Sequence, residues 1–311
     1  MKRDLRDVIN NHIIMHAEEF DIYVIAADSA ISSNLHIFKS RLGHRFIDVG
    51  VAEQNCFDVA AGLAHEGATV FVFGISTFLL YRGYEQLRSI ICESKFKVIF
   101  VGLWCGLYYS DQGYTHLQID DINVTRSLPN LNIYSPYSIL STTRCLDDAL
   151  KHEGPSYFRI ENPLPGGDYL ADHVPSNTSK FRDANNLAIL ATGQSVKRSL
   201  VASENLNSAL NLHIPVYPLC ELDINRLQSR SLDYINRYQN LLIVEEHLAS
   251  CGTGATIGFF SSGKEDGARI HCLGVGNSII RNQTYARALE FHVLNTSGII
   301  KKCLTLLEIE Q

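Results

Sequence analysis

Three sets of residues have the types and spacing from which chemistry could be built. Glu53 stands in the first turn of a helical pattern, directly after a short apolar strand pattern. Phe78, Tyr81 and Tyr84 recur every three residues in a second helical pattern and give it an aromatic stripe. His116 lies in a polar, glycine-containing loop after another apolar strand. A carboxylate at a strand-to-helix switch, followed by an aromatic helix, predicts a crevice at the carboxyl ends of parallel strands.

Each of these residues also has an ordinary structural interpretation. An acidic residue such as Glu53 at the start of a helix complements the helix dipole. An aromatic stripe commonly packs into a core, and a single loop histidine is commonly exposed. The residues by themselves leave the structural and the catalytic interpretations open.

The elements that would position these residues alternate between strands and helices. Continuous apolar strands separated by helices indicate a parallel sheet that is covered on both faces. In the first half of the chain we expect strands at 22–27, 46–49, 68–73, 97–103, 131–134 and 156–160, and helices at 5–18, 53–66, 77–91, 120–127 and 138–151.

A second domain is expected after a break in this pattern. Residues 161–183 are rich in Pro, Gly, Ser and Asp, which is typical of a linker. Beyond them we expect strands at 187–191, 215–219, 241–245 and 269–273, and helices at 195–210, 254–260 and 297–309. The sequence therefore predicts an α/β protein of two domains, 1–162 and 184–311, joined by a linker at 163–183. Each domain should be a mainly parallel sheet covered by helices.

Composition excludes several classes of partner. Apolar residues make up 46% and charged residues 19% of the chain, as in ordinary globular proteins. The net charge is −6 and there is no dense basic run, which disfavours nucleic acid as a partner. Acidic residues and histidines interrupt the apolar positions of residues 1–20, so we expect neither a signal peptide nor a membrane partner. Eight scattered cysteines without a CxxC pair favour reduced thiols in a cytoplasmic protein over a disulfide framework or a zinc site.

Several stretches together resemble the transketolase family of thiamine diphosphate enzymes. The matching residues are VAEQN at 51–55, AAGLAHEG at 60–67, STFLLYRGYEQLR at 76–88, DQGYTH at 111–116, LPNLNIYSP at 128–136 and VEEH at 244–247. The resemblance covers nearly the whole chain, but only the C-terminal half of the family. It implies a pyrimidine-binding domain at 1–162 and a transketolase C-terminal domain at 184–311.

The resemblance also implies roles for the first three sets of residues. The family's catalytic glutamate matches Glu53, and it hydrogen-bonds a ring nitrogen of the cofactor's aminopyrimidine, which promotes deprotonation of the thiazolium carbon. Phe78, Tyr81 and Tyr84 would form the pocket for that ring. His116 would be the second catalytic residue, a hydrogen-bond donor or proton shuttle beside the substrate oxygens.

Other substrate-binding residues follow from the same resemblance. Gln112 stands where the family usually carries an Asp that recognises a hydroxyl of the donor sugar, so the donor is not fixed by this motif. Arg159 matches a phosphate-binding arginine, and Arg6 is a second candidate for this role. Trp104 stands where many transketolases carry a histidine that contacts the acceptor phosphate, which favours a bulkier or flatter acceptor than a simple sugar phosphate.

One family motif does not occur in these 311 residues. Transketolases bind the cofactor's diphosphate and metal through a G-D-G motif that is followed by an Asn, and the nearest match, at 166–169, lies in the linker and lacks the final Gly. The resemblance therefore implies an N-terminal partner subunit that carries this motif and binds Mg²⁺ or Ca²⁺, with no metal ligand in this chain. We expect a heterotetramer of two plus two subunits that acts on small-molecule sugars.

The sequence as a whole favours the C-terminal subunit of a split transketolase-like enzyme of carbohydrate metabolism. It would transfer a two-carbon ketol unit from a ketose-type donor to an aldehyde or ketone acceptor. The alternatives are a 2-oxoacid dehydrogenase beta subunit, a deoxyxylulose phosphate synthase-like enzyme, and a catalytically silent structural partner. A dinucleotide-binding oxidoreductase is disfavoured, because the glycines at 251–258 and 274–276 lack the complete fingerprint.

Overall fold

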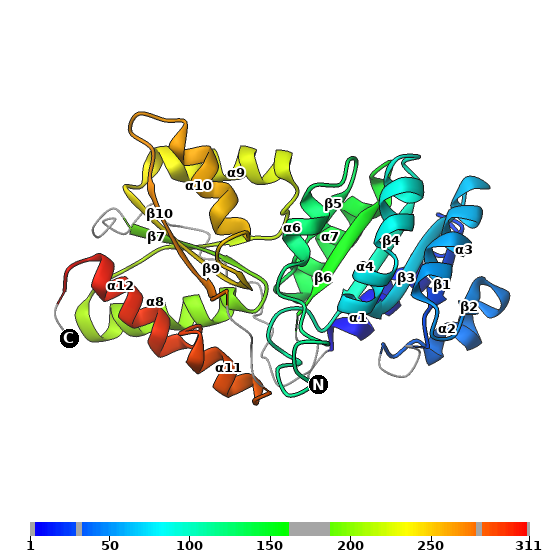
Figure 1. Ribbon diagram of the computed structural model, residues 1–311, viewed down its shortest axis with the longest axis horizontal. Helices are drawn as coiled ribbons and strands as arrows, with labels where there is room; N and C mark the ends of the chain where they lie inside the picture. The colour runs from blue at the N-terminus through cyan, green and yellow to red at the C-terminus, as the bar shows by residue number, and fades with distance from the viewer. Residues whose placement is uncertain (1–3, 29–32, 162–186, 278–281, 310–311) are drawn as a thin grey trace.

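Two α/β domains lie side by side in the computed structural model, each built on one sheet with helices on both faces (Figure 1). The structure describes residues 4–28, 33–161, 187–277 and 282–309. The α/β fold with two parallel sheets is as predicted. The predicted linker, 163–183, lies outside the described residues.

The first domain contains a six-stranded sheet in the order β2-β1-β3-β4-β6-β5, and all of its pairs are parallel. Its strands are β1 (Ile22–Ala26), β2 (Phe46–Asp48), β3 (Thr69–Ile75), β4 (Val98–Leu103), β5 (Asn132–Tyr134) and β6 (Ser156–Ile160). Every residue of β4 and β6 is buried. This explains why these strands appear as continuous runs and not as alternating patterns.

Helices cover both faces of the first sheet. One face carries α3 (Glu53–His65), α4 (Ser76–Arg82) and the π-helical segment Leu87–Cys92, and the other carries α1 (Leu5–His16), α2 (His36–Arg41) and α7 (Ile139–Lys151). Shorter pieces are the 3₁₀ turn Gly43–Arg45, α5 (Tyr84–Gln86) and α6 (Asp121–Arg126).

The helix predicted at 77–91 is divided into α4, α5 and the π-helical segment. Gly83 separates the first two pieces, and a Cβ atom there would lie 2.6 Å from Cε2 of Phe57 in α3. The chain therefore approaches α3 too closely at this point for a side chain, and the break allows that contact.

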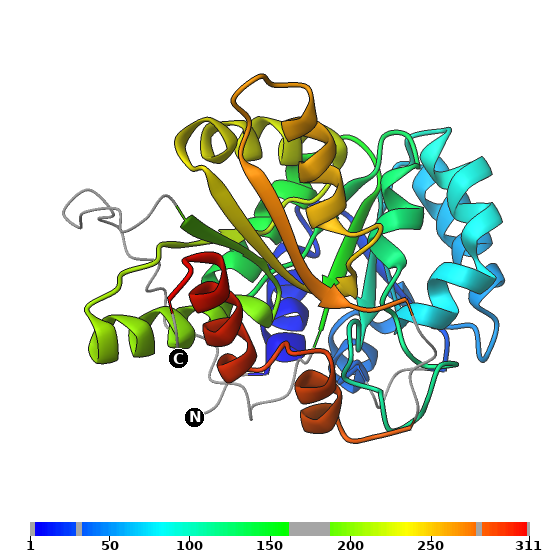
Figure 2. The same cartoon turned by 60° about the vertical axis from the view of Figure 1, so that its left-hand side comes forward.

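The second domain has a four-stranded parallel sheet in the order β10-β9-β7-β8. Its strands are β7 (Leu187–Thr192), β8 (Val216–Leu219), β9 (Asn240–Leu248) and β10 (Arg269–Val275), and its helices are α8 (Ser195–Leu210), α9 (Ile224–Arg237), α10 (Thr253–Ser262), α11 (Tyr285–Phe291) and α12 (Thr296–Leu306). Both views place α9 and α10 on one face of this sheet and α8 and α12 on the other (Figures 1 and 2).

Backbone hydrogen bonds join the two domains. The amide of Leu248 donates to the carbonyl of Ile119 at 2.7 Å, and the amide of Leu222 donates to the carbonyl of Ile133 at 2.8 Å. The second domain thereby contacts the loop after β4 and the edge strand β5 of the first sheet. None of the helices in the described ranges is long and apolar enough to cross a membrane. All eight cysteines are free thiols.

Candidate active site

The first turn of α3 presents Glu53 at the carboxyl edge of the first sheet. The turn before it is held by Asp48, whose carboxylate accepts hydrogen bonds from the amides of Gly50 at 3.0 Å and Asp28 at 3.1 Å. Gly50 has φ +70°, a conformation that disfavours other residues. Glu53 is only 7% exposed, and Oε1 accepts a hydrogen bond from Nη1 of Arg82 at 2.6 Å. The buried carboxylate therefore has a cationic partner.

A row of contacting side chains connects Glu53 with His116. The guanidinium of Arg82 lies over the ring of Phe78, 4.3 Å from its centroid. The ring of Phe78 in turn meets the imidazole of His116 edge to face, with centroids 5.0 Å apart. The structure thus brings three of the predicted site residues together through Arg82, which the sequence reasoning missed. The only sequence signal for it is its position one helical turn after Phe78.

An open pocket of about 730 Å³ lies against this row. It is lined by Val51, Ala52, Glu53, Gln54, Asn55, Asp58, Tyr81 and Arg82. Tyr81 is 44% exposed, while its hydroxyl accepts a hydrogen bond from Nε2 of Gln118 at 3.3 Å. Burial of the hydroxyl, followed by its hydrogen bond to Asp120, raises the pKa of Tyr81. The pocket therefore combines an ionic wall with an aromatic one.

Tyr84 does not line this pocket. Its hydroxyl donates to the carbonyl of Val124 in α6 at 3.0 Å. The break at Gly83 separates Tyr84 from the helix that carries Phe78 and Tyr81, so the aromatic stripe does not continue on one helix face. Of the three predicted aromatic residues, Tyr81 lines the pocket, Phe78 lies between Arg82 and His116, and Tyr84 contacts α6.

The loop after β4 carries His116 and Gln112. Nδ1 of His116 lies 3.0 Å from the hydroxyl of Thr115, and its carbonyl accepts a hydrogen bond from the Thr77 hydroxyl at 3.2 Å. The hydrogen bond from Thr77 connects the loop to the start of α4. Gln112 is exposed in the same loop. Its backbone amide donates to the carbonyl of Tyr109 at 2.9 Å.

Trp104 is 5% exposed and lies at the beginning of this loop. One ring face stacks on Tyr108 with centroids 4.9 Å apart, and the guanidinium of Arg6 lies 5.3 Å from the ring centroid. Arg6 also forms an ion pair with Asp4, in which Nη2 and Oδ2 are 2.5 Å apart. Protein groups thus occupy the surfaces of Trp104 and Arg6, and a stacking role for Trp104 toward a substrate does not fit this arrangement.

Arg159 lies in β6 with its side chain fully buried at the boundary between the domains. Nε donates to Oδ2 of Asp121 at 2.8 Å, Nη1 pairs with Glu161, and Nη2 donates to the carbonyl of Glu246 at 2.9 Å. Each of its nitrogens has a protein partner. The phosphate-binding role predicted for Arg159 does not fit this position, and the structure gives it an interdomain role.

The environment of Arg159 is an ionic cluster that shifts the pKa values of buried groups. Glu246 also accepts a hydrogen bond from Nη2 of Arg198 at 2.7 Å, so three buried carboxylates, those of Asp121, Glu161 and Glu246, face two guanidiniums. Burial and the charge of Glu246 raise the pKa of Glu161 to about 7.

His247 follows Glu246 in β9 and is fully buried beside this cluster. Its Nε2 lies 3.9 Å from Oδ1 of Asp121. Burial lowers the pKa of His247 to about 4, so its imidazole is neutral at pH 7. Like Glu161, it therefore titrates far from its ordinary range.

Known proteins resemble the chain over nearly its whole length. It is 30% identical over 310 residues to 1-deoxy-D-xylulose-5-phosphate synthase of Listeria monocytogenes, an alignment that covers 95% of this chain and 49% of that protein. It is 26% identical over 294 residues to one of the subunits of the apulose-4-phosphate transketolase of Phocaeicola vulgatus, with 92% of each chain covered. The chain thus spans about half the length of the first relative and nearly all of the second.

The fold has a close counterpart among solved structures. A split gene transketolase, described as an inactive beta4 tetramer, aligns with a TM-score of 0.79 at 22% identity and covers 99% of this chain and 100% of that one. The family model for the transketolase pyrimidine binding domain matches residues 2–165, more than half of the chain. With Glu53 and its pocket inside the matched region, the chain belongs to the transketolase family and carries that family's pyrimidine binding domain.

Proposed function

We propose that this chain is the C-terminal subunit of a split transketolase-like enzyme. In this proposal it transfers a two-carbon ketol unit from a ketose-type donor to an aldehyde or ketone acceptor. The observation that carries the proposal is the buried carboxylate of Glu53, which lines an open pocket and is connected through Arg82 and Phe78 to His116. The full-length likeness to a subunit of the apulose-4-phosphate transketolase supports it.

Thiamine diphosphate is the cofactor that the family implies, and the pocket fits its aminopyrimidine ring. Glu53 is placed to share a proton with a ring nitrogen, while Tyr81 offers a half-exposed aromatic face. When bound, the cofactor supplies the carbon nucleophile. Arg82 would hold the Glu53 carboxylate in position. His116, behind Phe78, would act on the substrate oxygens.

The other predicted binding residues differ in how well they fit. Gln112 is exposed in the His116 loop, and in this proposal it faces the donor. Tyr84 and Trp104 have packing roles, and Arg6 and Arg159 are engaged by carboxylates. A substrate phosphate would therefore need other cationic groups, which the partner subunit would supply.

We propose that an N-terminal transketolase subunit provides the other half of the site. That subunit would hold the diphosphate and Mg²⁺ or Ca²⁺, since the G-D-G motif is not among these residues. Val51, which lines the pocket, is 71% exposed, and Tyr114 in the His116 loop is 61% exposed. A partner subunit that covers the pocket would bury the exposed side chain of Val51. The proposed assembly is a cytoplasmic heterotetramer of two plus two subunits.

Reconstitution tests this proposal. The chain is mixed with a candidate partner that carries the G-D-G motif, and turnover is assayed with thiamine diphosphate, Mg²⁺ and a ketose donor. We expect no turnover by either subunit alone and turnover by the pair. Efficient turnover by this chain alone would contradict the need for a partner. An assembled pair that accepts only a 2-oxoacid donor would favour the dehydrogenase or deoxyxylulose phosphate synthase alternative, and an inert pair would favour a structural role.

A further inference from the structure

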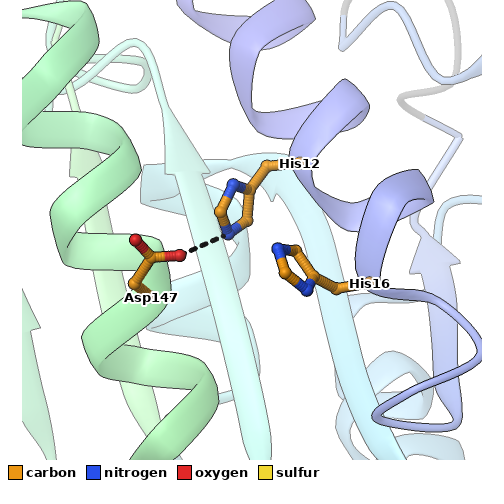
Figure 3. Close-up of side chains that lie close together, drawn as sticks. All are labelled: His12, His16 and Asp147. Carbon is orange, nitrogen blue, oxygen red and sulfur yellow. Dashed lines mark ion pairs between the residues drawn. The ribbon is translucent and has the colours of Figure 1, made fainter.

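A second cluster of chemically competent side chains lies outside the pocket, where α1 packs against α7 (Figure 3). His12 and His16 come from successive turns of α1, and Asp147 comes from α7. One ligand atom from each residue lies within 4.8 Å of the other two. Residues four apart on a helix share a face, so the two imidazoles point to the same neighbour.

His12 supplies the buried side of this cluster. Its side chain is 9% exposed, and Nε2 lies 3.1 Å from Oδ1 of Asp147. The geometry is nevertheless not that of a hydrogen bond, and this Nε2 has no hydrogen-bond partner among the described residues. The contact with Asp147 is an ion pair that leaves the hydrogen-bonding capacity of Nε2 unused, and a ligand between the two side chains would satisfy it.

His16 supplies the second nitrogen. Its Nδ1 lies 3.1 Å from Oε2 of Glu19, which leaves the other ring nitrogen for the cluster. Figure 3 shows one ring nitrogen of His16 directed toward His12 and Asp147. A carboxylate on the far nitrogen is the arrangement that orients metal-bound histidines and raises their basicity.

We propose that His12, His16 and Asp147 bind a divalent transition-metal ion, for which Zn²⁺ is the best match. Two imidazoles and one carboxylate form a ligand set that Zn²⁺ accepts, with a water molecule in the fourth position. In a tetrahedral Zn²⁺ site the ligand atoms are about 3.3 Å apart, so the cluster must contract slightly. Asp147 and His16, whose side chains are 46% and 28% exposed, have room for that movement.

The position of the cluster separates the ion from the pocket that contains Glu53. Helix α1 leads into the amino end of β1, whereas Glu53 follows the carboxyl end of β2. The cluster and the catalytic pocket therefore belong to opposite edges of the sheet. An ion here would crosslink α1 and α7, which together with α2 cover one face of the first sheet. The sequence reasoning missed the site because Asp147 is more than 130 residues from the histidines.

Zn²⁺ binding by metal-stripped full-length chain provides the test. Competition with a chromophoric chelator measures the affinity in the wild type and in two variants with partly exposed side chains, His16→Gln and Asp147→Asn. We expect one site in the wild type and at least a tenfold loss of affinity in each variant, since even outer partners of metal ligands contribute about that much. Glu19→Gln should lower the Zn²⁺ affinity less than His16→Gln or Asp147→Asn does. His44→Gln, which removes an exposed histidine elsewhere, is the matched control.

Two further measurements separate this site from the thiols. Co²⁺ absorption should show nitrogen and oxygen ligation without a thiolate charge-transfer band. Zn²⁺ should raise the unfolding temperature of the wild type and of His44→Gln, but not that of His16→Gln, because only folded chains with the intact cluster bind the ion. Equal Zn²⁺ affinity in the wild type, His16→Gln and Asp147→Asn would overturn the proposal, as would the absence of binding to the wild type.

Discussion

Glu53 combines burial with access to a pocket, and the proposed chemistry depends on it. We expect Glu53→Gln to lower turnover of the reconstituted pair by at least about 10²-fold, because glutamine keeps the size of the side chain but cannot share a proton. Assembly, measured by light scattering, should not change. Glu66→Gln at the exposed opposite end of the same helix is the control. Normal turnover in Glu53→Gln would reduce Glu53 to a helix-stabilising residue.

The aromatic residues of the same region should differ in their effect on cofactor binding. We expect Phe78→Ala and Tyr81→Ala to weaken thiamine diphosphate binding about 2- to 10-fold, which corresponds to the loss of one ring contact. Tyr84→Phe should leave binding unchanged, because Tyr84 packs on α6. Cofactor titrations of the reconstituted pair measure this. Equal losses in all three variants would point to a general distortion of the helix and not to ring contacts.

Sequence reasoning succeeds for single residues where the signal is local. The strand, the turn and the helix start around Glu53 are contiguous, so the position of its carboxylate can be predicted. Arg82 lies 29 positions from Glu53, and nothing local shows that the two pair. The partners of Arg159 come from α6, β9 and the end of β6. That all three guanidinium nitrogens have hydrogen-bond partners can therefore be seen only in the fold.

The break between α4 and α5 yields a prediction at the scale of elements. Replacing a helical glycine by alanine usually stabilises a protein by up to about 1 kcal/mol. At Gly83 the added Cβ would lie 2.6 Å from Phe57 Cε2 and 2.9 Å from the Leu79 carbonyl oxygen. We therefore expect Gly83→Ala to destabilise the chain by about 1–3 kcal/mol, the usual range for overpacking.

Gly62 in α3 provides the matched control for this substitution. A Cβ there would meet nothing within 4 Å, so Gly62→Ala should be neutral or stabilising. Chemical denaturation of both variants gives the comparison. If the two substitutions changed stability alike, the close contact with Phe57 would not be the cause of the break.

Elements are predictable from sequence to the extent that their burial is periodic or continuous. The strands of both sheets were found because their residues form apolar runs, and fully buried β4 is the clearest case. No helix is predicted from the sequence at α9, although its buried residues, Leu227, Ser231 and Ile235, recur every four positions and so carry a helical signal. Helix α11, with seven residues, is also absent from the sequence-based prediction.

At the scale of the molecule, the interdomain cluster should give two opposite pH dependences. Glu161 has a pKa of about 7 in the folded chain against an ordinary value of 4.5, so ionising it destabilises the folded state increasingly as pH rises from 4.5 to 7. His247 has a pKa of about 4 against 6.5, so protonating it destabilises the folded state increasingly as pH falls from 6.5 to 4. Each effect is on the order of 3 kcal/mol at its full extent.

Single substitutions should separate the two effects. Relative to the wild type, we expect the stability of Glu161→Gln to rise as pH increases from 4.5 to 7, because the variant no longer contains the unfavourable carboxylate. The relative stability of His247→Gln should instead fall as pH increases from 4 to 6.5. Urea denaturation at several pH values measures both slopes, independently of any constant offset. If the stability of both variants changed with pH in parallel with that of the wild type, the two groups would not be buried as described.

The architecture was easier to predict than the contacts between its parts. Alternating strands and helices with a central linker indicated two parallel sheets, and both are present. The order of the strands and the joining of the domains depend on pairs such as Leu248 with Ile119. Such backbone pairs involve no particular side chain, so the sequence contains no signal for them.

The left-handed backbone of Trp104, with φ +67°, limits which amino acids could replace it. Glycine alone would adopt this conformation without strain, but it would leave the space between Tyr108 and Arg6 empty. A large aromatic residue fills that space, but it must adopt a positive φ, which is unfavourable for a bulky side chain. The indole N–H has no hydrogen-bond partner among the described residues, so phenylalanine would lose no hydrogen bond. We therefore expect position 104 to accept other aromatic residues and to reject smaller ones, because the volume of the side chain matters there and its hydrogen bonding does not.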